Sequence, residues 1–573
     1  MSIDEQYDDA NSNTLLPSSS EPPVYVSSSP LRHVSQEKST GPADILQTAG
    51  GNARHPAATP PRNAGPSPAS MQRSSLKVHG DRIRTGGDFG ATIRRNGIVV
   101  DKSLICRVFW EDRAKAVCVH LPRRFGKTFN LSIIEEFFNV VTMRDMPRGS
   151  ASFDKELGKA ARRELFDQSL LETEAPRFFD RHFCRYPVIR LCFKGVTGSS
   201  QQTYYRSLMF RAFETVDTWV ERLYDVEIKP AASESWKDLR DYHTSLKREL
   251  ESIPASKWER DMSVVRFLIE YLMEFLRRQF DQKIMVLIDE YDVPLTVSRG
   301  KDWAGDTRAG YAKLLSFIFK NNEHLEKGLL VGVLRFTLSS VESGANSFGY
   351  HDLMADTDFA QPEIDMDEEA FDAPTPQLAD FFGYSESEVR LLFDVLKRRV
   401  GQRSTYPPVE SVMTTMHQWY DGYRIGQQTG RYNPYACCIF LADLIATGSL
   451  VVAARSHWEN TGSFQRLAAL VSRSRDKIQY LGSRLIREYD QGVPSGLAIA
   501  TGSSDSRLED DADGDDGRLR FMPNSLPSSP SGEYSLNELV TFFMYTGYLT
   551  LGSEGQIRIP NGEVRKVWRE LLR

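Results

Sequence analysis

The stretch Lys115–Thr128, KAVCVHLPRRFGKT, decides the fold of this chain. Its first seven residues form a short apolar run, which predicts a buried strand, and its remaining residues predict a loop. The next residues place Phe129, Ile133 and Phe137 at helical spacing. The sequence therefore predicts a strand, a loop and a helix, in that order, over residues 115–141.

The loop carries residue types that suit a bound phosphate. A phosphate-binding loop, or Walker A segment, offers backbone N–H groups, a lysine for the β- and γ-phosphates and a hydroxyl for Mg²⁺. Gly126, Lys127 and Thr128 match these roles in order, although Leu121 replaces the first glycine of the general pattern G-x-x-x-x-G-K-[ST]. An ordinary strand-to-helix turn with a cationic surface is the alternative, and Arg123 and Arg124 suit either interpretation.

A second segment, MVLIDE at 285–290, has the form of a Walker B strand. An acid at the carboxyl end of a buried parallel strand can hold the Mg²⁺ that Thr128 also binds, and the next acid can orient the attacking water. Asp289 could instead cap the turn or helix that follows. Two half-motifs, each at a predicted strand end, favour a nucleotide site.

The rest of the chain predicts an α/β fold with a parallel sheet, because apolar strands alternate with helices. The further strand candidates are 186–193, 283–288 and 328–336. After about residue 340 the strand signal fades, and helical patterns follow at 386–400, 409–420 and 433–444. We expect a P-loop NTPase core over 88–350 and a helical, lid-like region over 351–573.

Composition sets limits on the remaining segments. The 573 residues contain 71 Lys and Arg against 77 Asp and Glu, a net charge of −6, which gives no support for a nucleic-acid partner. Residues 1–80 are rich in Ser and Pro and are predicted to form a disordered tail. Residues 355–372 and 501–531 are acidic and are predicted to be solvated loops.

We expect a soluble, intracellular protein of the cytoplasm or nucleus. Six scattered cysteines without a C-x-x-C pair favour a reducing compartment over a disulfide framework or a metal site. The most apolar run, 435–454, contains Asp443 and a break at Gly448. It therefore predicts a buried helix followed by a short element, and no membrane span.

Several segments in order together resemble the AAA-ATPase-like family of P-loop proteins. The main ones are PRRFGKT at 122–128, LIDEYDVPL at 287–295, WYDGY at 419–423, YNP at 432–434 and GYLT at 547–550. The others are DFGATIRRNGIVVDKS at 88–103, YPVIRLCFKG at 186–195, GVLRFTLSSVESGANS at 332–347, FFGYSESEV at 381–389, HWENTG at 457–462 and IPNGEV at 559–564. The resemblance covers about 88–573.

The resemblance implies a role for each matching residue. Glu290 would be the catalytic carboxylate, assisted by Lys127, while Thr128 and Asp289 would hold Mg²⁺. Arg335 lies where such ATPases place a polar sensor residue, and pairing with a surface acid is its alternative. The residues implied to contact ATP are Pro122, Arg123, Arg124, Phe125, Gly126, Lys127, Thr128 and Arg335. The missing first glycine is typical of the family's PRRFGK form.

Two departures from the family pattern matter. Asp101-Lys102-Ser103 stands where the family has Asp-Lys-Thr, a change that keeps the hydroxyl. Longer members often carry a PD-(D/E)XK nuclease-like domain after the IPNGEV segment, and we expect no nuclease chemistry from this sequence. For the aromatic segments WYDGY, YNP and HWENTG, packing is favoured over contact with a ligand.

The expected function is Mg²⁺-dependent ATP binding and hydrolysis that couples nucleotide state to conformation, or to contact with a protein partner or a second copy of the chain. The alternative is a nucleotide-gated interaction module with negligible turnover, since no arginine of the sequence can be assigned to a neighbouring subunit's site. A phosphotransferase is a third option, for which the sequence shows no acceptor-site base.

Overall fold

A computed structural model describes most of the region after residue 76. The described residues are 77–80, 87–320, 322–336, 348–354, 376–400, 406–457, 474–493, 497–499, 518–519, 534–552 and 555–573. The acidic segment 355–372, most of 501–531 and nearly all of the predicted tail lie outside them. The last residues of the predicted tail belong to a short strand, β1 (Val78–His79), which pairs antiparallel with β2 (Val99–Val100).

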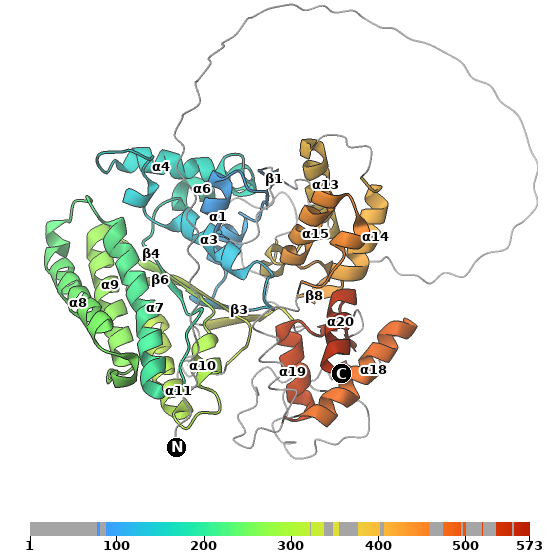
Figure 1. Cartoon of the computed structure of the whole chain (residues 1–573). Helices are drawn as coiled ribbons and strands as arrows, with labels where there is room; N and C mark the ends of the chain where they lie inside the picture. Colours follow the sequence, from blue (N-terminus) through green and yellow to red (C-terminus); the bar gives the residue numbers. More distant parts are fainter. Residues whose placement is uncertain are drawn as a thin grey trace, which may run out of the picture. The chain divides into compact units, whose positions relative to one another are not determined.

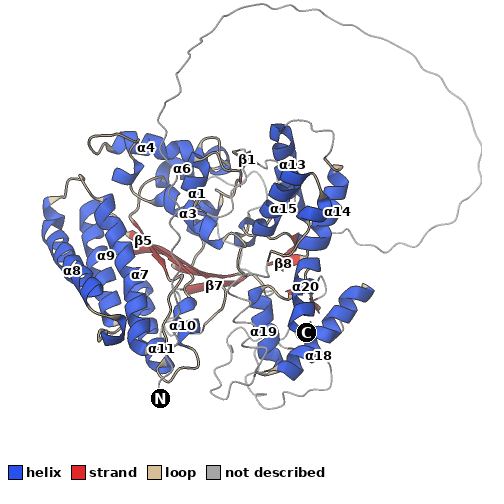
Figure 2. Cartoon of the chain, in the orientation of Figure 1, coloured by secondary structure: helices blue, strands red, loops and turns tan. Residues whose placement is uncertain are grey.

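A five-stranded parallel sheet forms the centre of the core, in the order β4-β5-β6-β3-β7 (Figure 2). The strands are β3 (Ala116–His120), β4 (Val188–Cys192), β5 (Ile284–Asp289), β6 (Leu325–Gly332) and β7 (Phe348–Asp352). The first four confirm the predicted strands. The fifth was missed because its sequence, FGYHD, contains no apolar run, and it ends two residues after the predicted core boundary at 350.

The two faces of the sheet belong to two apolar clusters, since side chains alternate along each strand. Met285 and Leu287 of β5 face one cluster, while Val286 and Ile288 face the other. Because both faces are covered, the central strands β5 and β6 are mainly apolar, as is typical of parallel sheets.

Helices cover each face (Figure 1). The first cluster includes side chains of α1 (Phe89–Arg94), α2 (Ile105–Glu111), α3 (Lys127–Phe138), α5 (Leu170–Glu174) and α6 (Pro176–His182), and α4 (Lys155–Arg163) lies nearby. The second includes α7 (Gln201–Arg222), α8 (Ser233–Ser252), α9 (Ser263–Phe280), α10 (Val293–Ser298) and α11 (Ala304–Phe319).

The region after the sheet is mainly helical, as predicted. The helices among its described residues are α13 (Glu386–Val400), α14 (Val409–Tyr420), α15 (Pro434–Thr447), α16 (Leu450–Ala453), α18 (Arg475–Gln491), α19 (Leu536–Thr546) and α20 (Gly562–Leu571). Short strand pairs join them, namely β8 (Tyr423–Ile425) with β9 (Gln428–Arg431), β10 (Ala498–Ile499) with β11 (Arg518–Leu519) and β12 (Thr550–Leu551) with β13 (Ile557–Arg558).

The apolar run 435–454 forms α15 and α16, which confirms a helix followed by a second short element. Across the described part of the chain, every helix falls short of the length and apolar character needed to span a bilayer.

The helical region shares its core with the first face of the sheet. Phe125, which precedes α3, belongs to one continuous buried cluster with Tyr423, Phe543 of α19 and Trp568 of α20. Helices α13, α14 and α15 form a separate cluster with Ile98 and Val100. The region is therefore packed directly behind the loop that the sequence marks as functional.

Candidate functional site

The loop between β3 and α3 has the geometry of a phosphate-binding turn. Gly126 is the residue before the first turn of α3 and has a φ of 89°, a left-handed conformation that favours glycine. Arg124 also has a positive φ, of 70°. The first N–H groups of a helix have no partner inside the helix, and together with the helix dipole they attract an anion. The start of α3 can therefore receive a phosphate group.

Lys127 lies across this loop. Its side chain is buried, and its Nζ donates to the carbonyl oxygens of Leu121, at 2.7 Å, and Pro122, at 2.6 Å. Burial lowers the pKa of Lys127 to about 8, and the carboxylates of Asp292, Asp289 and Glu290 limit the fall. The ammonium group is thus held at the loop by carbonyl groups that a phosphate can replace.

Two carboxylates, Asp289 as the last residue of β5 and Glu290 just after it, lie at the same edge of the sheet as the loop, because the carboxyl ends of parallel strands meet there. Asp289 is buried, and its Oδ1 has no hydrogen-bond partner among the described residues. Arg190 of the neighbouring strand β4 lies 3.9 Å from its Oδ2. A buried carboxylate oxygen without a partner is costly, so its presence favours a cation ligand.

Glu290 lies in a strained turn just after β5. Its φ is 50°, an uncommon value for a residue other than glycine. Burial raises its pKa above the ordinary glutamate value, and the nearby Arg123 opposes this rise. Strained backbone is found disproportionately at functional sites, because the surrounding structure must hold it in place.

The alternative role for Asp289 is not supported by the turn. The residue before the first turn of α10 is Asp292, whose Oδ2 accepts a hydrogen bond from the N–H of Leu334 at 3.0 Å. Asp289 therefore does not cap the helix that follows it. Its side chain remains at the edge of the sheet, as a Walker B acid requires.

Two of the residues predicted to contact ATP, Arg124 and Phe125, contact other parts of the chain instead. Arg124 Nη1 donates to the carbonyl oxygen of His457 at 2.8 Å, and its guanidinium lies 3.9 Å from the centroid of the Tyr435 ring. Phe125 packs edge-on against Tyr423, with ring centroids 4.8 Å apart. These two loop residues face the helical region.

The same contacts explain the aromatic motifs of the helical region. Tyr423 belongs to WYDGY, Tyr435 follows YNP, and His457 opens HWENTG, whose other residues lie outside the described part. Packing was the favoured interpretation for these motifs. What the sequence did not indicate is that Tyr423 and Tyr435 pack against the phosphate loop itself, since motif spacing says nothing about which distant segments meet.

Arg335, the predicted sensor residue, pairs with an acid of the sheet. Its Nη1 donates to Asp352 Oδ2 at 2.6 Å, and its guanidinium lies 4.3 Å from the centroid of the Tyr350 ring. Asp352 is buried, so the pair differs from the surface pair that the sequence left open. A role for Arg335 in sensing nucleotide stays a prediction.

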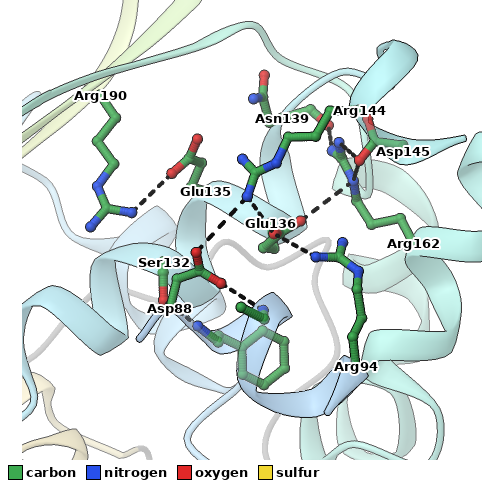
Figure 3. Close-up of polar contacts among 12 residues, drawn as sticks. Asp88, Arg94, Ser132, Glu135, Glu136, Asn139, Arg144, Asp145, Arg162 and Arg190 are labelled. Carbon is green, nitrogen blue, oxygen red and sulfur yellow. Dashed lines mark hydrogen bonds and ion pairs between the residues drawn. The ribbon is translucent and has the colours of Figure 1, made fainter. Parts of the chain in front are cut away.

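Ion pairs fix α3 against its neighbours (Figure 3). Glu135 accepts hydrogen bonds from Arg190 of β4, at 3.1 Å, and Arg222 of α7, at 2.7 Å. Burial alone would raise the pKa of Glu135, but Arg222 and Arg190 lower it to about 2. Around Glu136 lie three arginines, Arg94, Arg144 and Arg162, each 3.7 to 3.8 Å away. The helix that presents Lys127 and Thr128 is therefore held in a defined orientation.

Comparison with known proteins agrees with the loop and the sheet. Residues 86–342 match the AAA-ATPase-like family. The description of that family model is Predicted AAA-ATPase. The match confirms the resemblance over these residues, a range that includes the loop before α3, strand β5 and Arg335.

The chain was also compared with solved structures and with curated proteins. Among solved structures, the chain is similar to the Walker-type ATPase of Pyrococcus abyssi, with 11% sequence identity and a TM-score of 0.39, over 82% of this chain and 94% of that chain. No curated protein matches the sequence.

Three residues at the same edge of the sheet were not predicted from the sequence. They are His120, the last residue of β3, Tyr291, which follows Glu290, and Asp352, the last residue of β7. A signal was present for two of them, because His120 and Tyr291 flank the two Walker segments in the sequence. Asp352 could not be found, because its strand was not predicted.

Proposed function

We propose that the chain binds ATP with Mg²⁺ and hydrolyses it. The observation that carries this proposal is the placement of Lys127 in the loop before α3, at the sheet edge where β5 ends in Asp289 and Glu290. Its pKa of about 8 keeps most of the Lys127 side chain protonated at neutral pH, as phosphate binding requires. The match of residues 86–342 to predicted AAA-ATPases supports the same site.

The residues present fit a bound Mg²⁺. Asp289 offers a buried carboxylate oxygen without a hydrogen-bond partner, and Thr128 is exposed at the first turn of α3. Mg²⁺ in such sites takes one or two protein oxygens and fills its remaining positions with phosphate and water. We infer that Thr128 and Asp289 would hold the ion, which would neutralise charge on the phosphate oxygens.

Glu290 is the candidate for orienting the attacking water. Its raised pKa makes the carboxylate a better base than an ordinary exposed glutamate, and Arg123 lies close enough to influence it. Arg123 can also meet phosphate oxygens, since it is half-buried beside the loop. Lys127 and the N–H groups at the start of α3 would hold the β- and γ-phosphates.

The contacts of Arg124 and Phe125 with the helical region offer a route from nucleotide to partner. A phosphate that draws the loop forward would pull on Tyr435 and Tyr423, which these residues contact. We infer that ATP binding shifts the helical region and so changes its contact with a protein partner or a second copy of the chain.

One observation favours the alternative, a module that binds nucleotide with negligible turnover. Arg124 and Arg335, both predicted to contact ATP, are bonded to His457 and Asp352 instead. If no other arginine reaches the γ-phosphate, transition-state charge is less well stabilised and turnover falls by orders of magnitude.

Phosphate release separates these functions. We expect wild-type protein to release phosphate from Mg·ATP, Glu290→Gln to bind ATP with a greatly reduced single-turnover rate that is still measurable, and Lys127→Ala to lose binding. Lys327→Met is a matched control, because Lys327 is also a buried lysine with a pKa lowered to about 8, but lies near the amino end of β6. It should cost stability and keep ATP binding.

The result that contradicts hydrolysis is release no faster than that of a Lys127→Ala, Glu290→Gln double variant. ATP binding with such a rate would support the module. Transfer of the γ-phosphate to a small molecule, without free phosphate, would indicate the phosphotransferase.

A further inference from the structure

Three buried polar side chains lie next to the acidic turn, the segment Asp289–Glu290 at the end of β5. The Nε2 of His120 is 2.6 Å from the hydroxyl of Tyr291, and its Nδ1 is 2.7 Å from Asp352 Oδ1. All three side chains are almost completely buried. They connect the end of the Walker A strand, the residue after Glu290 and the end of the edge strand β7.

Tyr291 is anchored at every polar atom it possesses. Its N–H donates to Val331 O at 3.2 Å, and its carbonyl oxygen accepts from the hydroxyl of Tyr311 at 2.8 Å. Its own hydroxyl contacts His120 and lies 3.2 Å from the carbonyl oxygen of Leu334. Because Glu290 immediately precedes Tyr291 and has a strained φ of 50°, the anchoring of Tyr291 holds the backbone on one side of Glu290.

The protonation state of His120 depends on its neighbour Asp352. In a neutral imidazole one nitrogen donates and the other accepts. The negative charge of Asp352, 2.7 Å from Nδ1, favours a proton on that nitrogen of His120. Nε2 can then accept from the Tyr291 hydroxyl, whose single proton is shared between His120 Nε2 and the carbonyl oxygen of Leu334. Asp352 is itself held by Arg335, through the 2.6 Å hydrogen bond to its Oδ2. The charge of the carboxylate thus favours the tautomer in which Nε2 can accept from Tyr291.

His120 also contacts the helical region. The ring of Tyr545, on α19, meets the His120 imidazole edge-on, with centroids 6.1 Å apart. The contacts therefore run from Tyr291, the residue after Glu290, through His120 to a helix far away in the sequence.

We propose that His120 and Asp352 are positioning residues for Glu290: they hold the Tyr291 hydroxyl, and through it the strained turn that aims the Glu290 carboxylate at the attacking water. This inference rests on the proposed hydrolysis at the same site. It assigns no contact with ATP to the three residues, so their loss should change turnover and leave nucleotide affinity intact.

Tyr291→Phe removes the single hydroxyl and keeps the ring. Displacement of a catalytic group by about 1 Å can cost about a hundredfold in rate, and loss of a supporting hydrogen bond about ten- to a hundredfold. We expect kcat to fall at least about tenfold, with the Kd for ATP changed less than about twofold. His120→Gln, which keeps a polar atom for the Tyr291 hydroxyl, should retain more turnover than His120→Leu.

Tyr186→Phe is the matched control, since the Tyr186 hydroxyl bonds a buried histidine, His182 Nδ1, at 3.1 Å and far from the acidic turn. It should cost similar stability and leave kcat unchanged. Single-turnover rates in a Glu290→Gln background complete the test: if Tyr291 acts through Glu290, Tyr291→Phe should have no further effect there.

The outcomes separate the inference from the function on which it rests. Wild-type protein without turnover would overturn both. Wild-type turnover that Tyr291→Phe and His120→Leu leave intact would overturn the positioning role alone, as would an equal loss in both the wild-type and the Glu290→Gln backgrounds. If Tyr291→Phe fails to fold, His120→Gln and Asp352→Asn answer the same question.

Discussion

Lys127 shows how a single residue can be predicted from the sequence while its setting cannot. The motif identified this lysine because Gly126, Lys127 and Thr128 stand in order between a strand and a helix. Motif spacing carried no information about the two carbonyl groups that hold its ammonium group, or about the burial that lowers its pKa. Arg124 shows the same limit, since its turn toward Tyr435 depends on residues about 300 positions away.

The lowered pKa of Lys127 predicts how ATP affinity changes with pH. The protonated lysine binds phosphate, so affinity should fall as pH rises through about 8, by up to about tenfold per pH unit. The Kd measured by calorimetry between pH 7 and 9.5 tests this. Lys127→Arg, which stays charged, should flatten the profile, whereas a flat profile in wild-type protein would contradict the expectation.

The same shift has the opposite effect on the stability of the protein without nucleotide. Between about pH 8 and the ordinary lysine pKa of 10.5, the unfolded chain binds the proton that folded Lys127 has lost. Stability therefore gains from this group as pH rises through that window. Lys327 has the same lowered pKa and contributes the same trend, so the part of the gain that Lys127→Ala removes is the contribution of Lys127.

At the scale of elements, two features could not be predicted from local sequence: strand β7, and the contact between the WYDGY and IPNGEV segments of the helical region. The four apolar strands could be predicted because burial on both faces leaves a run of apolar residues. Strand β7 is an edge strand with Gly349, His351 and Asp352, and it is identified only by its pairing with β3. The WYDGY and IPNGEV segments were recognised separately, yet they meet: Asn561 Nδ2 donates to the carbonyl oxygen of Asp421 at 2.8 Å.

A substitution at Gly422 tests how much the contact between the WYDGY and IPNGEV segments contributes to stability. Its φ is 94°, and a Cβ added there would lie 2.1 Å from the carbonyl oxygen of Pro560. We expect Gly422→Ala to lower the free energy of unfolding by about 3 kcal/mol or more, because strain and a backbone clash add together. Denaturant unfolding measures the loss.

Gly492→Ala is the control for Gly422→Ala. Gly492 also has a positive φ, of 63°, but nothing lies within 4 Å of an added Cβ. Strain alone should then cost about 1 to 2 kcal/mol. Equal losses in the two variants would mean that the contact with Pro560 adds nothing to stability.

On the scale of the whole molecule, the sequence predicted the α/β core and the helical region but not their shared interior. The predicted boundary separates 88–350 from 351–573, whereas one apolar cluster joins Phe125 and Leu329 to Tyr423 and Trp568. Periodicity shows that a helix has an apolar face and leaves its partner unknown. The candidate site is accordingly a loop of the core supported by the helical region.

The central claim is that this loop binds ATP through Lys127, and nucleotide-dependent thermal unfolding tests it most directly. Ligand at one hundred times its Kd stabilises the folded state by about 2.7 kcal/mol. We predict that Mg·ATP raises the Tm of wild-type protein and leaves that of Lys127→Ala unchanged, with Lys327→Met responding as wild type does. An unchanged Tm in wild-type protein, or an equal rise in Lys127→Ala, would contradict the account.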